Sequence, residues 1–252
     1  MIENLEWILN DKTIPVEIRS RVFMDTTTRQ IGSIFKNSLP VLDEDSLESI
    51  RHVVGSSLSF LSTPEAIGNI GQFISHDYET FSHSVHVFTY TMMLMKFLSP
   101  DWEESSLIDV GIGALLHDIG KIHIPGSILK KPDKLNDQEW ITIRTHPIQG
   151  MRMCTNVSLP QNSLNCILFH HEKYDGSGYP TGMKQEEIPL PVRIITCCDV
   201  YDAITSNRPY SNAQTPFEAL KIMSNQMKNA FDLNVFKAFI EILAKTREKY
   251  GM

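Results

Sequence analysis

The sequence predicts an all-α fold. Apolar residues recur at spacings of three and four through most of the 252 residues, and the alternation typical of a half-buried β-strand is scarce. The apolar fraction of 42% and the charged fraction of 21% are those of an ordinary globular protein. We expect a helical bundle over residues 71–252, preceded by a small helical lobe over residues 1–70.

The N-terminal part predicts several amphipathic helices over residues 1 to about 65. Ile31, Ile34, Phe35 and Leu39 fall on one face of such a helix. The stretch LSTPEAIGNIGQFI then predicts a new helix. In it, Thr63 is suited to the N-cap position and Pro64 to the first turn.

The composition changes from Tyr78 onward, where the next helix begins. A second helix is expected from about Ser105 to His117, and residues 119–135 are expected to form a connecting loop. The first of these helices carries an apolar stripe of Phe81, Val85, Phe88, Met92 and Met95.

Helix-start patterns divide the rest of the chain. Asn136 and Glu139 match a capping box, and Pro147 suits the first position of the helix that begins at THPIQG. The stretch SLNCILFHHE is followed by a glycine-rich loop, YDGSGYPTGMKQEEIP, and by the helix PVRIITCCDVYDAITS. Two further helices close the chain.

The charge and the cysteines exclude several classes of protein. The net charge is −7, which argues against broad binding to DNA or to anionic membranes. The four cysteines form no CxxC pair, so a reducing cytoplasm fits best. The apolar segment 87–98 is too short to span a bilayer and contains Lys96, and the acidic N-terminus lacks the basic start of a signal peptide.

Several histidines and aspartates stand in settings that suit a metal site. Imidazole and carboxylate together suit iron, manganese and zinc, whereas the lack of thiolate in the pattern argues against a structural zinc finger. Ligands on separate helices are the usual way in which a helical bundle builds a metal centre. The set implies two or three ions and comprises His83, His117, Asp118, His146, His170, His171 and Asp199.

The pair His117 and Asp118 suggests a hydrolytic reaction. A carboxylate such as Asp118 can bridge two ions roughly 3.5–4 Å apart, which hold a shared hydroxide and polarise a phosphodiester. Lys121 would place its charge on a non-bridging phosphate oxygen. We therefore expect Asp118 and Lys121 to act in catalysis.

The ordered motifs resemble the HD-GYP family, a branch of the HD phosphohydrolases that degrades cyclic dinucleotides. The resemblance covers about Tyr78 to Leu220. It rests on HDIGK at 117–121, HP at 146–147, HHEKYDGSGYP at 170–180 and DVYDAITSNRPY at 199–210.

The resemblance implies roles for individual residues. The seven histidines and aspartates above would be metal ligands, and Glu79, one turn before His83, would bind a third ion. Lys121 and Arg208 match residues that grip substrate phosphate. The substrate cleft would be bordered by Gly178, Tyr179 and Pro180. The chain departs from the family after RPY, where Ser211 replaces a common basic residue, and this departure puts substrate preference in question.

The leading hypothesis is a phosphodiesterase that opens cyclic di-GMP to pGpG, with GMP as a further product, using two or three iron or manganese ions. The alternatives are a phosphodiesterase for another cyclic dinucleotide, such as 3',3'-cGAMP, and a receptor that binds without cleaving. The resemblance also allows a partner of the diguanylate cyclase type at the GYP loop, and a homodimer.

Some residues near the motifs are given a structural interpretation. His86, like His52, His76 and His123, is expected to be an ordinary core or surface histidine. Asp202 is either a support for a histidine ligand or a solvated acid. Glu172 is either a support for a ligand or a surface residue, and the first is favoured. The adjacent Cys197 and Cys198 are expected to be small core residues.

Overall fold

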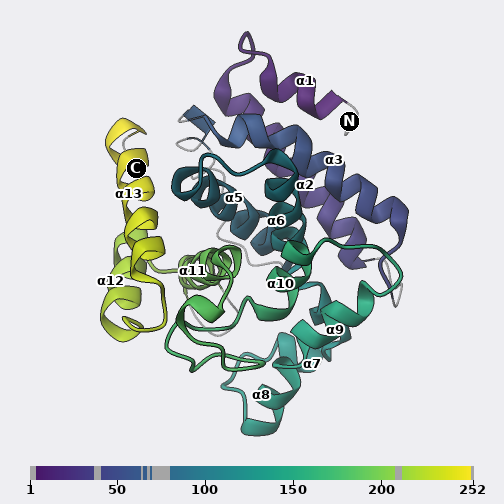
Figure 1. Cartoon of the computed structure of the whole chain (residues 1–252), viewed down its shortest axis with the longest axis vertical. Coiled ribbons are helices and arrows are strands. Elements are labelled where there is room, and N and C mark those ends of the chain that lie inside the picture. The colour runs from purple at the N-terminus through teal and green to yellow at the C-terminus, as the bar shows by residue number, and fades with distance from the viewer. Residues whose placement is uncertain are drawn as a thin grey trace.

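The computed structural model describes residues 4–36, 41–63, 65–66, 69, 80–207 and 212–250; for residue 80 and residues 246–250 only the backbone is described. These residues form helices and no β-strand, so the all-α prediction is confirmed (Figure 1). The α-helices are α1 (Leu5–Asn10), α2 (Val16–Lys36), α3 (Glu44–Leu61), α5 (Thr80–Leu98), α6 (Glu104–Leu116), α7 (Gly126–Leu129), α8 (Asp137–Ile143), α9 (His146–Met153), α10 (Gln161–Phe169), α11 (Leu190–Thr205), α12 (Pro216–Gln226) and α13 (Leu233–Tyr250), and the short 3₁₀ helices are η2 (Ile119–His123) and η3 (Gln185–Glu187).

Helix α5 lies at the centre of the bundle and packs against α2, α6, α11 and α13 (Figure 1). Its residues 83–95 are all buried, on every side of the helix. The predicted apolar stripe was therefore too narrow, because neighbours surround this helix instead of covering one face. The small and polar residues between the apolar ones, such as Ser84 and Thr91, are buried as well.

The N-terminal helices share the core of the bundle. One apolar cluster runs from Leu5 to Ile242, and in it Phe23 of α2 contacts Phe60 and Phe88, with both pairs of ring centroids 6.3 Å apart. The buried face of α2 includes Ile31 as predicted, while Leu39 lies outside the described residues. The predicted boundary near residue 70 also falls in a stretch outside them and stays a prediction.

The predicted helix starts are largely confirmed. The Ala66 N–H donates to Thr63 Oγ1 at 3.2 Å, as an N-cap requires, while Pro64 lies outside the described residues. The capping box at α8 has both of its hydrogen bonds, between Asn136 and Glu139, at 2.8 and 2.9 Å. Pro147 lies in the first turn of α9.

Residues 119–135 are not the continuous loop that we expected, since they contain η2 and α7. Bonds three residues apart close the tight turns of η2, with Lys121 N–H donating to the Asp118 carbonyl at 2.9 Å. Gly120 lets η2 approach α9 closely, because a Cβ there would collide with the His146 carbonyl oxygen and the Gly150 nitrogen. This approach brings the HDIGK and HP motifs together.

Candidate metal centre

The seven predicted ligands meet in the interior, although they come from separate helices. His83 projects from α5 and Asp199 from α11, while the others lie at helix ends: His117 and Asp118 directly after α6, His146 at the start of α9, and His170 and His171 directly after α10. All are buried except His171, whose side chain is 24% exposed. The ligand atoms fall into two groups whose members lie within 4.8 Å of one another: Asp118, His146, His170 and His171 in one, and His83, His117 and Asp199 in the other.

The carboxylate of Asp118 lies between the two groups. Its Oδ1 is 3.3 Å from His146 Nε2 and 3.8 Å from His170 Nε2. Its Oδ2 faces the other group, at 3.6 Å from His83 Nε2 and 3.4 Å from His117 Nε2. One carboxylate thus presents an oxygen to each group, which is the geometry expected of a bridging ligand.

Asp199, on α11, also connects the two groups. Its Oδ1 is 3.0 Å from His83 Nε2, and its Oδ2 is 3.5 Å from His171 Nδ1. The two groups are therefore connected through two carboxylates and form one continuous cluster.

Three of the imidazoles are oriented by hydrogen bonds at Nδ1, the ring nitrogen that points away from the cluster. In His117, His146 and His170, Nδ1 lies 2.8, 2.8 and 3.0 Å from the carbonyl oxygen three residues earlier. An Nδ1–H that donates to a carbonyl leaves the lone pair on Nε2, which is the tautomer that binds a metal. The backbone thus directs three nitrogen lone pairs into the cluster.

The interior of the cluster lacks the hydrogen bonds that buried polar atoms require. The buried His117 Nε2 and Asp118 Oδ1 have no hydrogen-bond partner among the described residues. The Nε2 atoms of His146 and His170 are 3.1 Å apart, although both point lone pairs at each other. Two ligands of one metal at about 2.1 Å each would lie roughly 3 Å apart, so a cation fits these residues.

Burial and the local charges favour the protonation states that bind metal. Burial lowers the pKa of His170 well below its usual range and that of His171 to about 3, so both imidazoles are neutral at neutral pH. Burial alone would raise the pKa of Asp118, but the adjacent charge of Lys121 holds the pKa well below its usual range. Neutral imidazole and ionised carboxylate are the forms that bind metal.

Lys121 lies at the rim of the cluster. Its Nζ is 2.6 Å from Asp118 Oδ2, and its side chain is 13% exposed. We expected it to touch substrate phosphate and not the metal site. The structure adds a contact with the bridging carboxylate itself.

The GYP loop lies against the cluster. The ring of Tyr179 is 4.7 Å from that of His171, and the guanidinium carbon of Arg144 is 5.2 Å from the Tyr179 ring centroid. A Cβ at Gly178 would collide with the backbone of residues 171–173, so only glycine lets the loop fold back this closely. Pro180 follows Tyr179 and is half-buried.

We expected Glu172 to support a metal ligand, but its side chain holds the GYP loop instead. Its buried carboxylate accepts hydrogen bonds from the N–H and the hydroxyl of Thr181, both at 2.7 Å, and from the N–H of Gly182 at 3.1 Å. The charge of Glu172 thus fixes the end of the GYP loop beside the cluster.

The sequence interpretation missed a pairing of His86 with Asp202. Asp202 accepts from His83 Nδ1 at 2.7 Å and from His86 Nδ1 at 2.9 Å, and all three side chains are buried. Asp202 therefore supports the proposed ligand His83, and His86 is a buried core histidine, as expected, that shares Asp202 with His83. A regular spacing could have revealed the pairing, since His86 follows His83 by three positions and Asp202 follows Asp199 by three.

Two residues of the predicted site, Glu79 and Arg208, lie outside the described residues, as does Ser211, the position that departs from the family pattern. The adjacent Cys197 and Cys198 are fully buried, as predicted, and all four cysteines are free. In the described part of the chain, no helix is both long enough and apolar enough to cross a membrane.

This chain belongs to the HD domain family, whose model matches residues 72–235. The matched range contains the His117–Asp118 pair, and the resemblance carried by the sequence motifs is confirmed. The cyclic di-GMP phosphodiesterase PA4108 of Pseudomonas aeruginosa is 40% identical over 188 residues, which are 73% of this chain and 44% of that relative.

A second type of relative carries a different substrate in its name. The 3'3'-cGAMP-specific phosphodiesterase 3 of Vibrio cholerae is 35% identical over 171 residues, 68% of this chain and 37% of that relative. The chain thus spans less than half the length of both relatives. The solved structure of Bd1817, an HDG"Y"P protein from Bdellovibrio bacteriovorus, matches 96% of this chain and 77% of its own with a TM-score of 0.77 at 19% identity, which supports the fold.

Proposed function

We propose that the chain is a metal-dependent phosphodiesterase that hydrolyses cyclic di-GMP to linear pGpG, with GMP as the product of a second cleavage. The observation that carries the proposal is the pair of ligand groups joined through Asp118 and Asp199. The donors are imidazole and carboxylate, which suit iron or manganese. Two ions would be held by the described residues, and Glu79 is the ligand proposed for a third.

The residues around the cluster would each have a separate role in hydrolysis. When bound, the metal ions would activate water and neutralise charge on the phosphodiester. Lys121, at the rim and next to Asp118, would offer its ammonium to a non-bridging phosphate oxygen. Tyr179 would form one wall of the cleft, where burial, followed by the charge of Asp199, raises the pKa of its hydroxyl and keeps it a hydrogen-bond donor. Arg208 is the second phosphate contact proposed.

A phosphodiesterase for 3',3'-cGAMP is the second candidate, because relatives named for that substrate match the chain at 35% and 34% identity. A receptor without activity is disfavoured by the complete set of seven ligands together with Lys121. The two substrates differ by one base, so the metal cluster itself cannot distinguish them.

The test uses protein loaded with manganese or with iron, whose metal content is measured before the assay. We expect conversion of cyclic di-GMP to pGpG, and a competition with 3',3'-cGAMP at limiting enzyme ranks the two substrates. A His117→Ala variant should lose metal and turnover together. A site that is occupied by either metal and yet inactive on both substrates would contradict the proposal.

We also propose a location, two interactions and a domain boundary for the chain. The four free cysteines favour a reducing cytoplasm as the location. A cyclase-type partner would meet the chain at the GYP loop, and a homodimer would use the N-terminal helices. We propose the boundary between lobe and catalytic domain at residue 70.

A further inference from the structure

One face of α8, beside the GYP loop, forms an open hollow of about 300 Å³. Its lining residues are Asp137, Trp140, Ile141 and Arg144, which follow one another at intervals of three, one and three positions. Such spacing places all four on the same side of a helix. The hollow, hereafter the α8 hollow, is therefore a continuous strip that ends at Arg144.

The α8 hollow exposes large apolar side chains. Trp140 is 48% exposed and Ile141 is 59% exposed, although each could contribute to a core. The start of the helix that carries them is stabilised, because Glu139 completes the capping box and also binds Lys131 Nζ at 2.7 Å. The exposed indole of Trp140 offers a flat surface for stacking, since aromatic side chains are the groups on which bases stack in single-stranded nucleic acids.

Arg144 connects the α8 hollow to the metal centre. It lines the hollow, and its guanidinium also lies over the ring of Tyr179, which in turn lies over His171. The Arg144 guanidinium carbon is 5.2 Å from the Tyr179 ring centroid, and that centroid is 4.7 Å from the His171 ring centroid. The guanidinium therefore lies within about 10 Å of the His171 ring. A nucleotide whose phosphate lies at the metal centre can span this interval with its sugar and base.

The lining matches the hydrogen-bonding pattern of guanine. Guanine offers O6 and N7 as acceptors, which an arginine can bind, and its N1–H and N2–H₂ donors suit a carboxylate such as Asp137. Adenine carries an acceptor at N1 and has no amino group at C2, so it would face the Asp137 carboxylate with a lone pair. Asp137 is thus a group that can distinguish the two purines.

We propose that the α8 hollow is a guanine subsite, in which one base of the cyclic dinucleotide stacks on Trp140 and pairs with Asp137 and Arg144. The proposal rests on the proposed function and adds a specificity-determining surface to it. The subsite would favour a substrate with at least one guanine.

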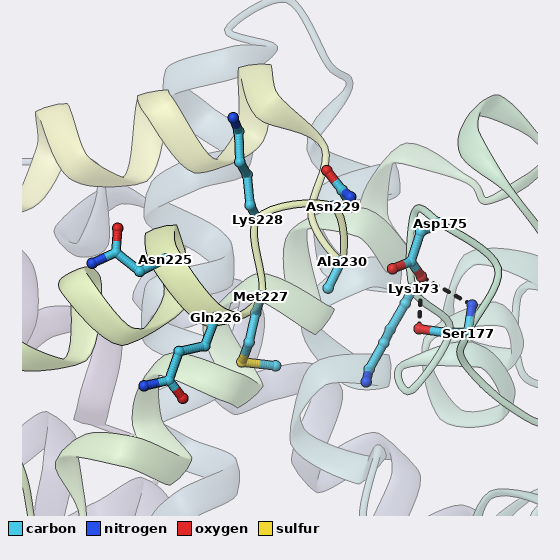
Figure 2. A pocket seen from close by; sticks show the side chains of 9 residues that line it. All are labelled: Lys173, Asp175, Ser177, Asn225, Gln226, Met227, Lys228, Asn229 and Ala230. Atoms are coloured by element: carbon cyan, nitrogen blue, oxygen red, sulfur yellow. Dashed lines mark hydrogen bonds between the residues drawn. The ribbon is translucent and has the colours of Figure 1, made fainter.

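A second hollow, of about 310 Å³, does not have these properties (Figure 2). It lies between residues 173–177 and 225–230 and has no aromatic residue in its lining. Figure 2 shows Lys173 and Lys228 directed away from each other, and the Asp175 carboxylate is already bonded to the N–H and the hydroxyl of Ser177, at 2.9 and 2.7 Å. The α8 hollow is therefore the better candidate for a base.

The first experiment compares KM and kcat for cyclic di-GMP in Trp140→Ala, Trp140→Phe and the wild type, at measured metal content. Loss of the stacking plane should raise KM roughly tenfold with unchanged metal content, and phenylalanine should restore most of the loss. Trp7→Ala, which removes a 66% exposed tryptophan on α1, is the matched control and should leave KM unchanged. An unchanged KM in Trp140→Ala would overturn the subsite while leaving the proposed function in place.

The second experiment tests base selectivity through Asp137→Asn. This variant should lose roughly tenfold in kcat/KM for cyclic di-GMP relative to cyclic di-AMP, because the amide no longer offers two acceptor oxygens to guanine. Equal losses for both substrates would contradict the role of Asp137.

A binding measurement covers the case in which no substrate is turned over. The chain has three tryptophans, so a Trp7→Phe/Trp102→Phe protein reports on Trp140 alone. Titration with cyclic di-GMP should quench its fluorescence saturably, and cyclic di-AMP should do so much more weakly. Selective quenching without turnover would refute the enzyme and keep the subsite; equal or absent quenching would refute the subsite.

Discussion

Replacing Asp202 with asparagine tests how the protein supports its metal ligands. The Asp202 carboxylate accepts from two buried imidazoles, His83 at 2.7 Å and His86 at 2.9 Å. The asparagine amide keeps only one acceptor oxygen, so one of the two Nδ1–H groups must face an NH₂ group. The change leaves all seven proposed ligands in place.

The expected loss is in metal affinity. Removing the hydrogen-bond partner of a ligating histidine costs about 10- to 100-fold in metal affinity, which corresponds to about 1.4–2.7 kcal/mol. Because His83 contributes only to the group with His117 and Asp199, we expect one ion to weaken more than the other. The Ser206 hydroxyl donates at 3.2 Å to Asp202 Oδ2, the oxygen that also accepts from His83, and this bond would change as well.

The assay is a competition between the protein and a chelator of known manganese affinity, followed by metal analysis of the protein fraction. The matched control is Asp25→Asn, which makes the same chemical change at an exposed position of α2. His86→Ala should weaken binding less than Asp202→Asn, because it leaves the bond from Asp202 to His83 intact. Wild-type manganese affinity in a folded Asp202→Asn protein would show that Asp202 does not support a metal ligand.

Three other changes have defined outcomes. Lys121→Ala should retain both ions and lower kcat roughly 10²-fold, measured on metal-loaded protein, whereas loss of metal would show that its contact with Asp118 matters more than its contact with phosphate. Gly178→Ala should cost about 1–3 kcal/mol in unfolding free energy, measured by denaturation, because its Cβ meets the backbone of residues 171–173; wild-type stability would contradict this account of the loop. Removal of metal by a chelator should abolish turnover and lower the melting temperature, and readdition of manganese should restore both. An unchanged melting temperature would argue against a buried ion.

The fold and most of the site follow from the sequence for identifiable reasons. Helix periodicity reports only which residues avoid water, and it therefore identified α5 but not that this helix is covered on every side. The convergence of His117, Asp118, His170 and His171 was predictable because they stand in adjacent pairs at helix ends, within ordered motifs.

The missed features depend on contacts between distant parts of the chain. His86 and Asp202 are 116 positions apart, and only the packing of α5 on α11 brings them together. Likewise, the contact of Arg144 with Tyr179 depends on the fold of the GYP loop, which the local sequence does not specify. The 3₁₀ helix η2 packs closely on α9 at Gly120, where a glycine alone predicted only a loop.

We infer that Asp118 bridges two metal ions held by the surrounding histidines, because its two oxygens face the two ligand groups. The most direct test of this bridge is the number of ions per chain in protein prepared without chelator, compared between the wild type and Asp118→Ala. We predict at least two ions per wild-type chain and loss of this binding in the variant. Two tightly bound ions in Asp118→Ala, or fewer than two in a fully active wild type, would contradict the account.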